Sequence, residues 1–317
     1  MPPSLVSPPG SSSVRAVLKL TYACNQRCAF CRVDDLRGTV IDVPAETVVR
    51  KALRAKELGV DTLLFSGGEP TLRADLPRLA RAMTAIGLRW GLITNGRRLA
   101  HPAYLDLLMS LGLVYVHTSL HGATSATHDS LVECAGFDEV VEALRLLAGR
   151  GVELHVNSVV TRSNIAEMKA IGDLLAEFAP LTHKICLAEP RGRFLELADR
   201  LMVPPETAGR AAEAAVHAAR EHHAISGLDV VIEGFPLCQV PSIGSAVSGL
   251  RQHNIMFMSE GFEDDWYPTD SGQRTYPATC DGCAKREDCP GVYVGYAERF
   301  GVVGLRAFRK GRQATAD

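Results

Sequence analysis

The sequence predicts an α/β fold in which parallel strands alternate with helices, followed by a small cysteine-rich region. Two observations lead to this prediction. Short apolar runs alternate with longer amphipathic segments, which is typical of strand–helix units in a parallel sheet. Several apolar runs also end in polar or glycine-containing turns. That arrangement indicates a (β/α) barrel, because barrel sites lie on the loops that follow the strands.

The strand–helix units extend over residues 14–203. Helical crossovers should make the strands parallel and the connections right-handed. Residues 1–13 are rich in Pro and Ser and predict a disordered tail. Residues 204–317 differ, with an Ala-rich helix over 206–223, a strand over 228–233 and then an irregular stretch. In the first region we expect strands over residues 14–20, 60–65, 90–94, 114–120, 153–160 and 182–187, and helices over 44–58, 76–86, 104–111, 137–148 and 165–178.

Composition excludes several classes of protein. The chain has 317 residues, 46% of them hydrophobic, which is enough for a large core. Its net charge of −2 gives no broad basic surface, so general nucleic-acid binding is not expected. We see no apolar run of about 18 residues and no secretory signal, and therefore expect no membrane association. Nine cysteines, some with metal-like spacing, favour the reducing cytoplasm over a disulfide scaffold.

Three cysteines, Cys24, Cys28 and Cys31, are spaced C-x3-C-x2-C directly after the first expected strand. A tight loop of this kind can aim three sulfurs at one point. Three thiolates hold three corners of a [4Fe–4S] cluster and leave the fourth iron open to a ligand. A structural zinc knuckle and a disulfide pair with a spare thiol are the alternatives. Zinc usually takes four protein ligands, and no fourth Cys or His follows nearby.

This cysteine spacing, with the aromatic Phe30 before the last cysteine, resembles the signature of the radical S-adenosylmethionine (SAM) superfamily. The resemblance implies an open (β/α)6 barrel, that is, a partial TIM-like barrel. It also implies a [4Fe–4S] cluster on Cys24, Cys28 and Cys31, with SAM chelating the open iron.

The segment Gly67, Gly68, Glu69 and Pro70 resembles the GGEP motif of the same superfamily. In relatives this motif cradles the amino group of the methionine moiety of SAM. The glycines permit positive φ angles and a close approach of backbone to ligand, and Glu69 can accept hydrogen bonds from an ammonium group. The alternative is an ordinary Gly-Pro turn at the end of a strand.

Polar residues at the ends of later strands are further candidates for SAM binding. The resemblance implies a ribose contact for Ser119, whereas Asn95 also fits a simple Asn-Gly turn. Arg162 and Asn164 are within reach of the SAM carboxylate or ribose, and Asn164 is equally suited to cap the next helix. Arg193 lies in a basic loop that suits an anionic substrate or the SAM carboxylate, and an exposed, solvated loop is the alternative. The candidates are Thr94, Asn95, Ser119, Asn157, Arg162 and Arg193.

Three further residues have weaker signals. His121 is a candidate for a substrate-facing acid or base, although a turn residue is the preferred interpretation. Cys134 and Cys186 are expected to be small buried residues. Cys186 lies on the sixth strand, where it can also face the cavity.

A second group of cysteines lies near the C-terminus, where Cys280, Cys283 and Cys289 are spaced C-x2-C-x5-C and Cys238 precedes them at long range. Four thiols can close a site, and a zinc ion is the alternative on spacing alone. The run resembles the auxiliary-cluster region of the SPASM and twitch subgroup, which implies a second [4Fe–4S] cluster. A full SPASM domain has more cysteines and usually two such clusters, so this region looks twitch-sized or truncated.

The resemblance implies an enzyme that cleaves SAM reductively to a 5′-deoxyadenosyl radical, which takes a hydrogen atom from the substrate. We expect a small-molecule substrate that is oxidised or rearranged, an auxiliary cluster that assists electron transfer, and an electron donor such as flavodoxin or ferredoxin. A peptide-modifying (RiPP) maturase is the alternative. It would usually have a peptide-docking domain before the barrel, where only a short tail is seen. A non-catalytic iron–sulfur or zinc protein is the third hypothesis, but such a protein needs no SAM pocket.

Overall fold

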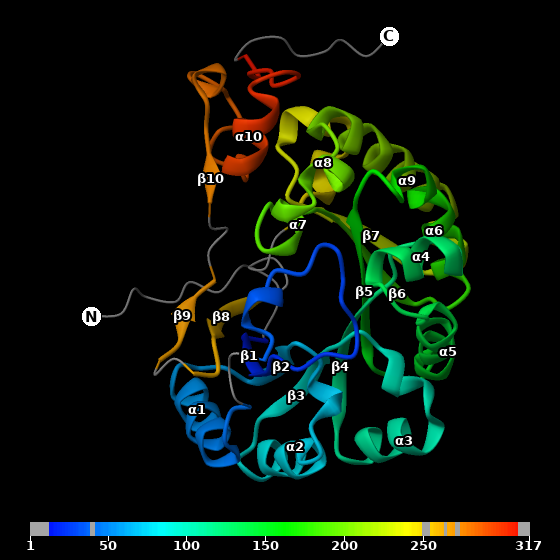
Figure 1. The fold of residues 1–317 in the computed structure, drawn as a ribbon, viewed down its shortest axis with the longest axis vertical. Coiled ribbons are helices and arrows are strands. Elements are labelled where there is room, and N and C mark those ends of the chain that lie inside the picture. Colours follow the sequence, from blue (N-terminus) through cyan, green and yellow to red (C-terminus); the bar gives the residue numbers. More distant parts are fainter. Residues whose placement is uncertain (1–12, 39–41, 249–253, 263–264, 270–272, 310–317) are drawn as a thin grey trace.

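The computed structural model describes residues 13–38, 42–248, 254–262, 265–269 and 273–309. The tail expected over residues 1–13 lies outside them, apart from Ser13. The described chain forms a curved sheet with most helices on its outer side (Figure 1). The expected α/β partial barrel is thus confirmed.

Within the described residues, the main sheet has nine strands in the order β7-β6-β5-β4-β3-β2-β1-β8-β9. All neighbours from β7 to β8 pair in parallel, and only β8 and β9 are antiparallel. The strands are β1 Arg15–Thr21, β2 Thr62–Gly67, β3 Arg89–Ile93, β4 Leu113–Ser119, β5 Glu153–Val160, β6 Leu181–Leu187, β7 Leu228–Glu233, β8 Ile255–Ser259 and β9 Tyr267–Pro268.

This sheet is wider than the six strands expected from the sequence. β7 is predicted as a strand, but the structure pairs it in parallel with β6 and so adds it to the barrel sheet. β8 lies in the stretch interpreted as irregular, yet it pairs in parallel with β1 at the opposite edge. Both strands bury alternate apolar residues, and a strand five or six residues long gives too weak a pattern to reveal its partner.

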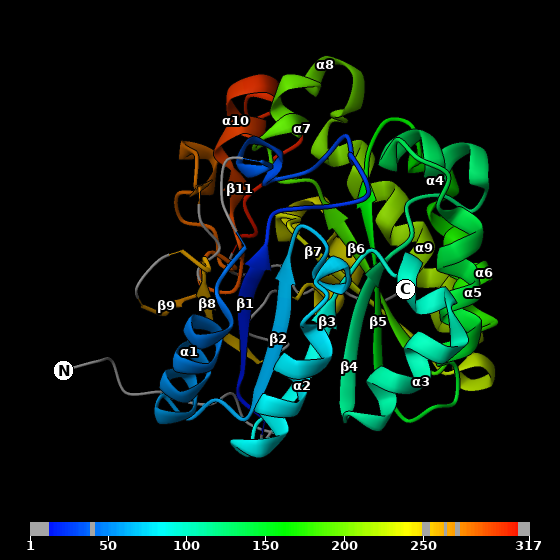
Figure 2. The same ribbon diagram turned by 60° about the horizontal axis from the view of Figure 1, so that its bottom comes forward.

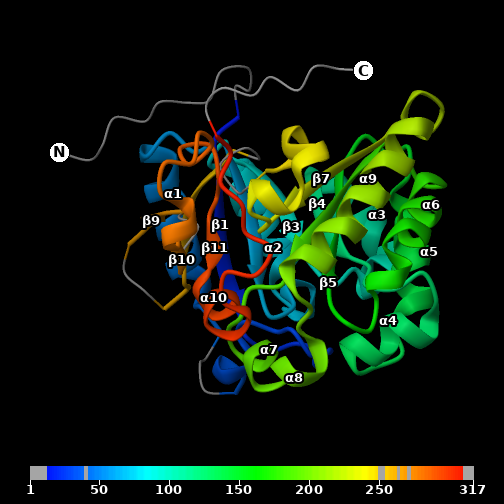
Figure 3. The ribbon, with the colours of Figure 1, turned by 90° about the horizontal axis from the view of Figure 1, so that it is seen from above.

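The helices form an outer ring and a group at the carboxyl ends of the strands (Figures 1 and 3). α1, α2, α3, α5, α6 and α9 cover the outside of the sheet, and α9 packs against α6 and β7. The bounds are α1 Ala45–Glu57, α2 Leu76–Ala85, α3 Pro102–Ser110, α4 Ser125–Val132, α5 Phe137–Leu147, α6 Met168–Ala176, α7 Arg193–Glu196, α8 Ala198–Leu201, α9 Pro205–Ser226 and α10 Val294–Phe300.

The start of α6 corrects one expectation. Asn164 does not cap this helix, because a 3₁₀ turn over Ile165–Glu167 precedes α6 and no side-chain cap bond forms. The Asn164 side chain turns back instead. Its Oδ1 accepts from the backbone N–H of Thr161 at 2.8 Å, and its Nδ2 donates to the carbonyls of His121 at 2.8 Å and Val159 at 2.9 Å. All of its polar atoms are therefore used within the fold.

The two faces of the sheet differ in character. The outer face and the helices share a large core, to which residues such as Phe65, Trp90 and Ile185 contribute. Burying each such side chain stabilises the fold by about 1.5–3 kcal/mol. On the inner face the apolar part is small, a cluster of Val17, Leu64, Tyr115 and Ile255. Several residues on the inner face that alternate with the core positions of β4–β7 are instead polar: His117, Ser119, His155, Asn157, Lys184, Cys186 and Glu233.

The loop after β1 and helices α7, α8 and α10 lie together at the carboxyl ends of the strands (Figure 2). The short antiparallel pair β10 (Arg274–Thr275) and β11 (Val292–Tyr293) leads into α10. An ion pair between Arg299 and Asp199 joins α10 to α8. The C-terminal cysteine region therefore stands beside the loops where a barrel site is expected. Within the described residues, no helix combines the length and apolarity needed to cross a bilayer.

Candidate functional site

The cysteine loop, residues 22–33, follows β1 and carries Cys24, Cys28 and Cys31. A turn brings the backbone N–H of Cys31 to 3.0 Å from the carbonyl of Cys28. Burial raises the pKa of Cys28, and the neighbouring Cys24 and Cys31 raise it further because nearby negative charge disfavours the thiolate. Cys28 thus shares its surroundings with the other two thiols of the loop. A bound cation would remove this repulsion, and the thiol set fits the iron–sulfur cluster expected there.

Gly67 and Gly68 pack directly on the start of the cysteine loop. A Cβ on Gly67 would meet the carbonyl oxygen of Thr21 at 2.1 Å, and one on Gly68 would meet that of Ala23 at 2.3 Å. The backbone N–H of Gly68 donates to Thr21 at 2.7 Å, and that of Glu69 donates to Ala23 at 2.8 Å. The glycines therefore allow two backbone turns to lie against each other, which places the GGEP turn beside the thiols.

Glu69 is fully buried, and groups of this chain saturate its carboxylate. Oε1 accepts from the backbone N–H and hydroxyl of Thr71, at 2.9 and 2.6 Å, and from the hydroxyl of Thr94 at 2.7 Å. Oε2 accepts from the backbone N–H of Asn95 at 2.7 Å. Burial raises the pKa of Glu69, although these hydrogen bonds oppose the rise. The predicted contact with the SAM ammonium remains a prediction. Next along the chain, Pro70 begins a 3₁₀ turn.

Asn95 connects the end of β3 to the cysteine loop. Its Nδ2 donates to Oδ1 of Asn25 at 2.7 Å and lies 4.0 Å from the sulfur of Cys24. Arg97 adds a hydrogen bond to the carbonyl of Asn25 at 3.0 Å and an ion pair with Glu139. Sequence reasoning missed Asn25 and Arg97. The available signal was their position, inside the cysteine spacing and just after the Thr-Asn-Gly turn.

His121 is packed as an interior residue. It is buried, its ring lies 4.4 Å from that of Phe30 between centroids, and it stacks on His128 at 5.8 Å. Its Nδ1 accepts from the backbone N–H of Val159 at 3.2 Å. Burial lowers its pKa well below the usual value, which keeps the ring neutral. Phe30 of the cysteine loop thus packs against His121, and this packing favours the structural interpretation of His121.

The remaining SAM-binding candidates separate into two sets. Ser119 and Asn157 are register partners on β4 and β5, and the thiol of Cys186 donates to Oδ1 of Asn157 at 2.8 Å. These side chains lie on the inner face. Arg162 is exposed and donates to the carbonyl of Met202 at 2.9 Å. Arg193 turns to the cysteine loop itself, where protein groups occupy its guanidinium.

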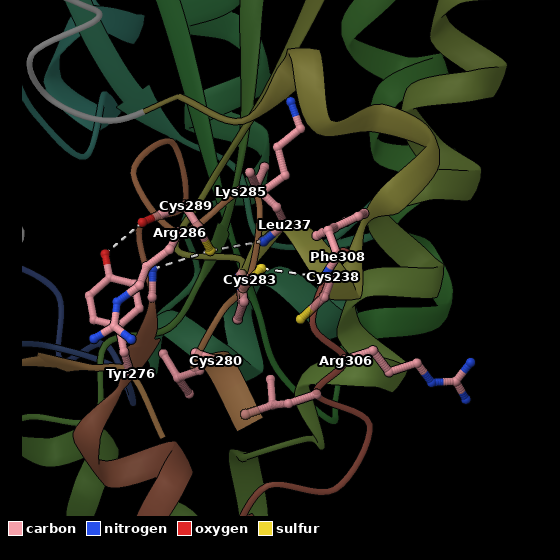
Figure 4. A pocket seen from close by; sticks show the side chains of 14 residues that line it. Leu237, Cys238, Tyr276, Cys280, Cys283, Lys285, Arg286, Cys289, Arg306 and Phe308 are labelled. Atoms are coloured by element: carbon pink, nitrogen blue, oxygen red, sulfur yellow. Dashed lines mark hydrogen bonds between the residues drawn. The ribbon is translucent and has the colours of Figure 1, made fainter. Parts of the chain in front are cut away.

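The four C-terminal thiols, Cys238, Cys280, Cys283 and Cys289, line one pocket of about 360 Å³, open solvent included (Figure 4). Cys238 follows β7, and the other three come from the loop between β10 and β11. Burial raises the pKa of Cys238, and the nearby Cys289 and Cys280 raise it further. Within the described part of the chain, no three His, Cys, Asp or Glu side chains converge on one single-ion position. Four thiols around one pocket are a ligand set for an iron–sulfur cluster or a zinc ion.

Backbone N–H groups point at the sulfurs of this pocket. Cys289 accepts from Leu237 at 3.4 Å and from Gly291 at 3.5 Å, and Cys283 accepts from Phe308 at 3.3 Å (Figure 4). Such donors favour thiolates and tune cluster potentials. The residues present therefore fit the second cluster that the resemblance to the SPASM and twitch subgroup implies.

Fold and site together define a class: a partial (β/α) barrel protein with a three-thiol loop after its first strand and a glycine turn packed beside it. Comparison with known families agrees. Residues 18–175 match the Radical SAM superfamily. The chain belongs to the radical SAM superfamily.

Curated relatives match part of the chain. A probable GTP 3′,8-cyclase of Saccharolobus islandicus (strain M.14.25 / Kamchatka #1) is 33% identical over 153 residues, which cover 48% of this chain and 49% of that protein. The PqqA peptide cyclase of Ruegeria pomeroyi is 33% identical over 166 residues, covering 52% and 44%. The chain thus spans about half the length of the curated relatives it matches.

Solved structures show the same fold. SuiB of Streptococcus suis, in a crystal structure with S-adenosylmethionine, has a TM-score of 0.67 at 16% identity, over 94% of this chain and 76% of that one. Another structure of SuiB holds the precursor peptide SuiA. At this identity the likeness extends to the fold alone.

Proposed function

We propose that the protein is a radical SAM enzyme with its reactive centre at the cysteine loop. The supporting observation is the gathering of Cys24, Cys28 and Cys31 on a loop packed against the GGEP turn. When bound, a reduced [4Fe–4S] cluster with SAM supplies a 5′-deoxyadenosyl radical that takes a hydrogen atom from the substrate.

The residues of this chain would bind and orient that chemistry. The three cysteines would hold three irons and leave one coordination position for SAM. Asn95, fixed by Glu69 on one side and bonded to Asn25 on the other, would keep the loop close to the GGEP turn. Ser119 on the inner face, where the barrel wall limits access of water, would face the nucleoside.

The C-terminal pocket would hold an auxiliary [4Fe–4S] cluster of the SPASM or twitch kind. Four thiols and at least three backbone donors to sulfur support this assignment. Zinc remains the alternative occupant. Because all four corners would have protein ligands, the proposed role is to assist electron transfer rather than to bind substrate.

We assign the substrate to the class of polar small molecules, which the enzyme would oxidise or rearrange. The inner face of β5–β7 carries Asn157, Cys186 and the ion pair of Lys184 with Glu233. A sheet face of this kind suits a substrate with several hydrogen-bonding groups.

A peptide substrate is the second candidate, because one relative at 33% identity is named as a peptide cyclase. Incubation with small polar metabolites and, separately, with precursor peptides would distinguish the two classes.

The environment would be the reducing cytoplasm. All nine cysteines are free, as iron–sulfur ligation requires. A flavodoxin or ferredoxin would donate the electron.

The experiment is anaerobic reconstitution followed by iron counting and an assay for 5′-deoxyadenosine. The wild type should hold about eight irons, and Cys28→Ala and Cys283→Ala about four each. Cys28→Ala should abolish SAM cleavage. Cys186→Ser, at a thiol of β6 that contacts Asn157 and belongs to neither thiol group, is the matched control and should keep all the iron. Cleavage by Cys28→Ala would refute the proposed centre, and one zinc per chain with four irons would show that the C-terminal site binds zinc.

A further inference from the structure

The cysteine loop has no regular secondary structure between Thr21 and Asp34, so other segments must hold it in place. The C-terminal end of α4 provides part of this support. The backbone N–H of Arg27 donates to the carbonyl of Val132 at 3.1 Å, and that of Ala29 donates to Leu131 at 2.8 Å. These bonds fix the middle of the loop. The carbonyl of Arg27, which precedes Cys28, and the carbonyl of Cys31 need other partners.

Arg193, at the start of α7, bonds to both of those carbonyls. Its Nη1 donates to the carbonyl of Arg27 at 2.5 Å, and its backbone N–H donates to the carbonyl of Cys31 at 3.2 Å. The two bonds therefore bracket the segment that carries Cys28 and Cys31. The bond from Nη1 is charge-assisted, and the planar guanidinium also restricts the direction in which this bond forms.

The guanidinium is itself held. Its Nη2 pairs with Oε1 of Glu133 at 2.7 Å, and only 13% of the Arg193 side chain is exposed. Glu133 ends α4 with a φ angle of 54°, a conformation that turns the chain back towards the loop. Arg193 thus joins the β6–α7 turn, the α4–α5 turn and the cysteine loop.

Gly192, the residue before Arg193, also lies against the cysteine loop. Gly192 has a φ angle of 52°, and a Cβ there would lie 2.7 Å from the carbonyl oxygen of Cys31. On the other side of the turn, Glu189 pairs with Arg32 at 2.9 Å. The turn thus contacts the loop at the last cysteine and at the residue that follows it.

We infer that Arg193 is a positioning residue of the cysteine loop, which holds Cys28 and Cys31 ready for the cluster through the carbonyls of Arg27 and Cys31. Its guanidinium is committed to protein groups, so it does not bind the SAM carboxylate or an anionic substrate. This inference rests on the proposed assignment of the cysteines as cluster ligands.

Hydrogen exchange of the cluster-free protein tests the positioning directly. Arg193→Gln should speed exchange of the Ala29 and Cys31 amides by about tenfold, the effect of losing one charge-assisted bond, and leave the amides of β1 and β2 unchanged. Arg193→Lys should show a smaller effect because it keeps the ion pair with Glu133. Arg200→Gln, an exposed residue of the adjacent helix α8, is the matched control.

A second measurement follows iron release to a chelator from the reconstituted enzyme. Arg193→Gln should release the iron of the N-terminal cluster about tenfold faster, and Glu133→Gln should do so to a lesser extent. The double variant should release iron little faster than Arg193→Gln alone, since both substitutions break the same ion pair between Arg193 and Glu133. The KM for SAM should change less than kcat, because SAM is not the partner of Arg193.

Unchanged exchange and iron release in Arg193→Gln would overturn the inference. Faster exchange throughout β1 and β2 would also overturn it, since the residue would then only stabilise the fold. A large rise in KM for SAM with normal loop exchange would show a ligand contact instead. The exchange result does not depend on radical chemistry, so it holds even if Cys28→Ala disproves the proposed function.

Discussion

The buried carboxylate of Glu69 accepts a hydrogen bond from the hydroxyl of Thr94 at 2.7 Å, and this joins the end of β2 to the end of β3. The same carboxylate holds the backbone of Asn95, whose side chain contacts the cysteine loop. One acidic residue therefore controls how the GGEP turn and the thiols are arranged.

Glu69→Gln should destabilise the protein. In glutamine an NH2 group replaces one carboxylate oxygen and faces an N–H or O–H group that also donates. At least one buried hydrogen bond is therefore lost, which lowers the free energy of unfolding by about 1–3 kcal/mol. Urea unfolding of the cluster-free protein measures this change. Glu57→Gln alters an exposed ion pair on α1 and should change stability by less than about 1 kcal/mol. In the reconstituted enzyme, Glu69→Gln should weaken SAM binding more than it lowers iron content. Equal losses of both would contradict the role proposed for this turn.

Gly68→Ala should displace the cysteine loop. The added Cβ would meet the carbonyl oxygen of Ala23 at 2.3 Å, and a backbone oxygen cannot rotate away. Overpacking of this kind costs about 1–3 kcal/mol, and we expect lower thermal stability with reduced iron retention. Gly172→Ala is the control. It lies in α6, where the nearest atom to the new Cβ is 4.0 Å away, so it should stabilise by about 0.5–1 kcal/mol. A Gly68→Ala protein with normal iron content would show that the close packing is not needed.

The ion pair between Arg15 and Glu153 should make stability depend on pH. Arg15 on β1 bonds both carboxylate oxygens of Glu153 on β5, at 2.8 and 2.5 Å, and thus links two distant strands of the barrel. Burial tends to raise the pKa of Glu153, but hydrogen bonds from His155 and Arg15 outweigh it and lower the pKa to about 2. The pKa of an unfolded glutamate is about 4.3, so the contribution is complete above that pH and is lost as pH falls towards 2.

Glu153→Gln should therefore lower stability near pH 6 and have less effect near pH 3. Since 46% of the Glu153 side chain is exposed, solvent screening limits the difference to about 1 kcal/mol or less. Urea unfolding at the two pH values gives the comparison. A difference that stays constant or grows at low pH would contradict the assignment.

Gly295→Ala should loosen α10 from the turn that carries Arg193. A Cβ on Gly295 would lie 2.7 Å from the ring of Pro190, which has no alternative rotamer to adopt. We expect faster limited proteolysis between β11 and the C-terminus while the barrel remains resistant. Unchanged proteolysis would show that the contact between Pro190 and α10 is easily relieved.

Much of this molecule follows from local sequence. The alternation of apolar runs determined the strands and helices of the barrel, because backbone periodicity is set by neighbouring residues. The spacing of Cys24, Cys28 and Cys31 similarly predicted the three-thiol loop where we propose the cluster, since the three residues lie within one short stretch of chain.

Only the tertiary structure decided the contacts between distant segments. It placed β7 and β8 in the barrel sheet, enclosed the carboxylate of Glu69, and brought Arg193 to the carbonyls of the cysteine loop. The physical reason is that a buried charge takes whichever partner the closed chain brings within hydrogen-bond distance. Glu133 meets Arg193 across 60 residues of sequence, and no local pattern specifies that distance.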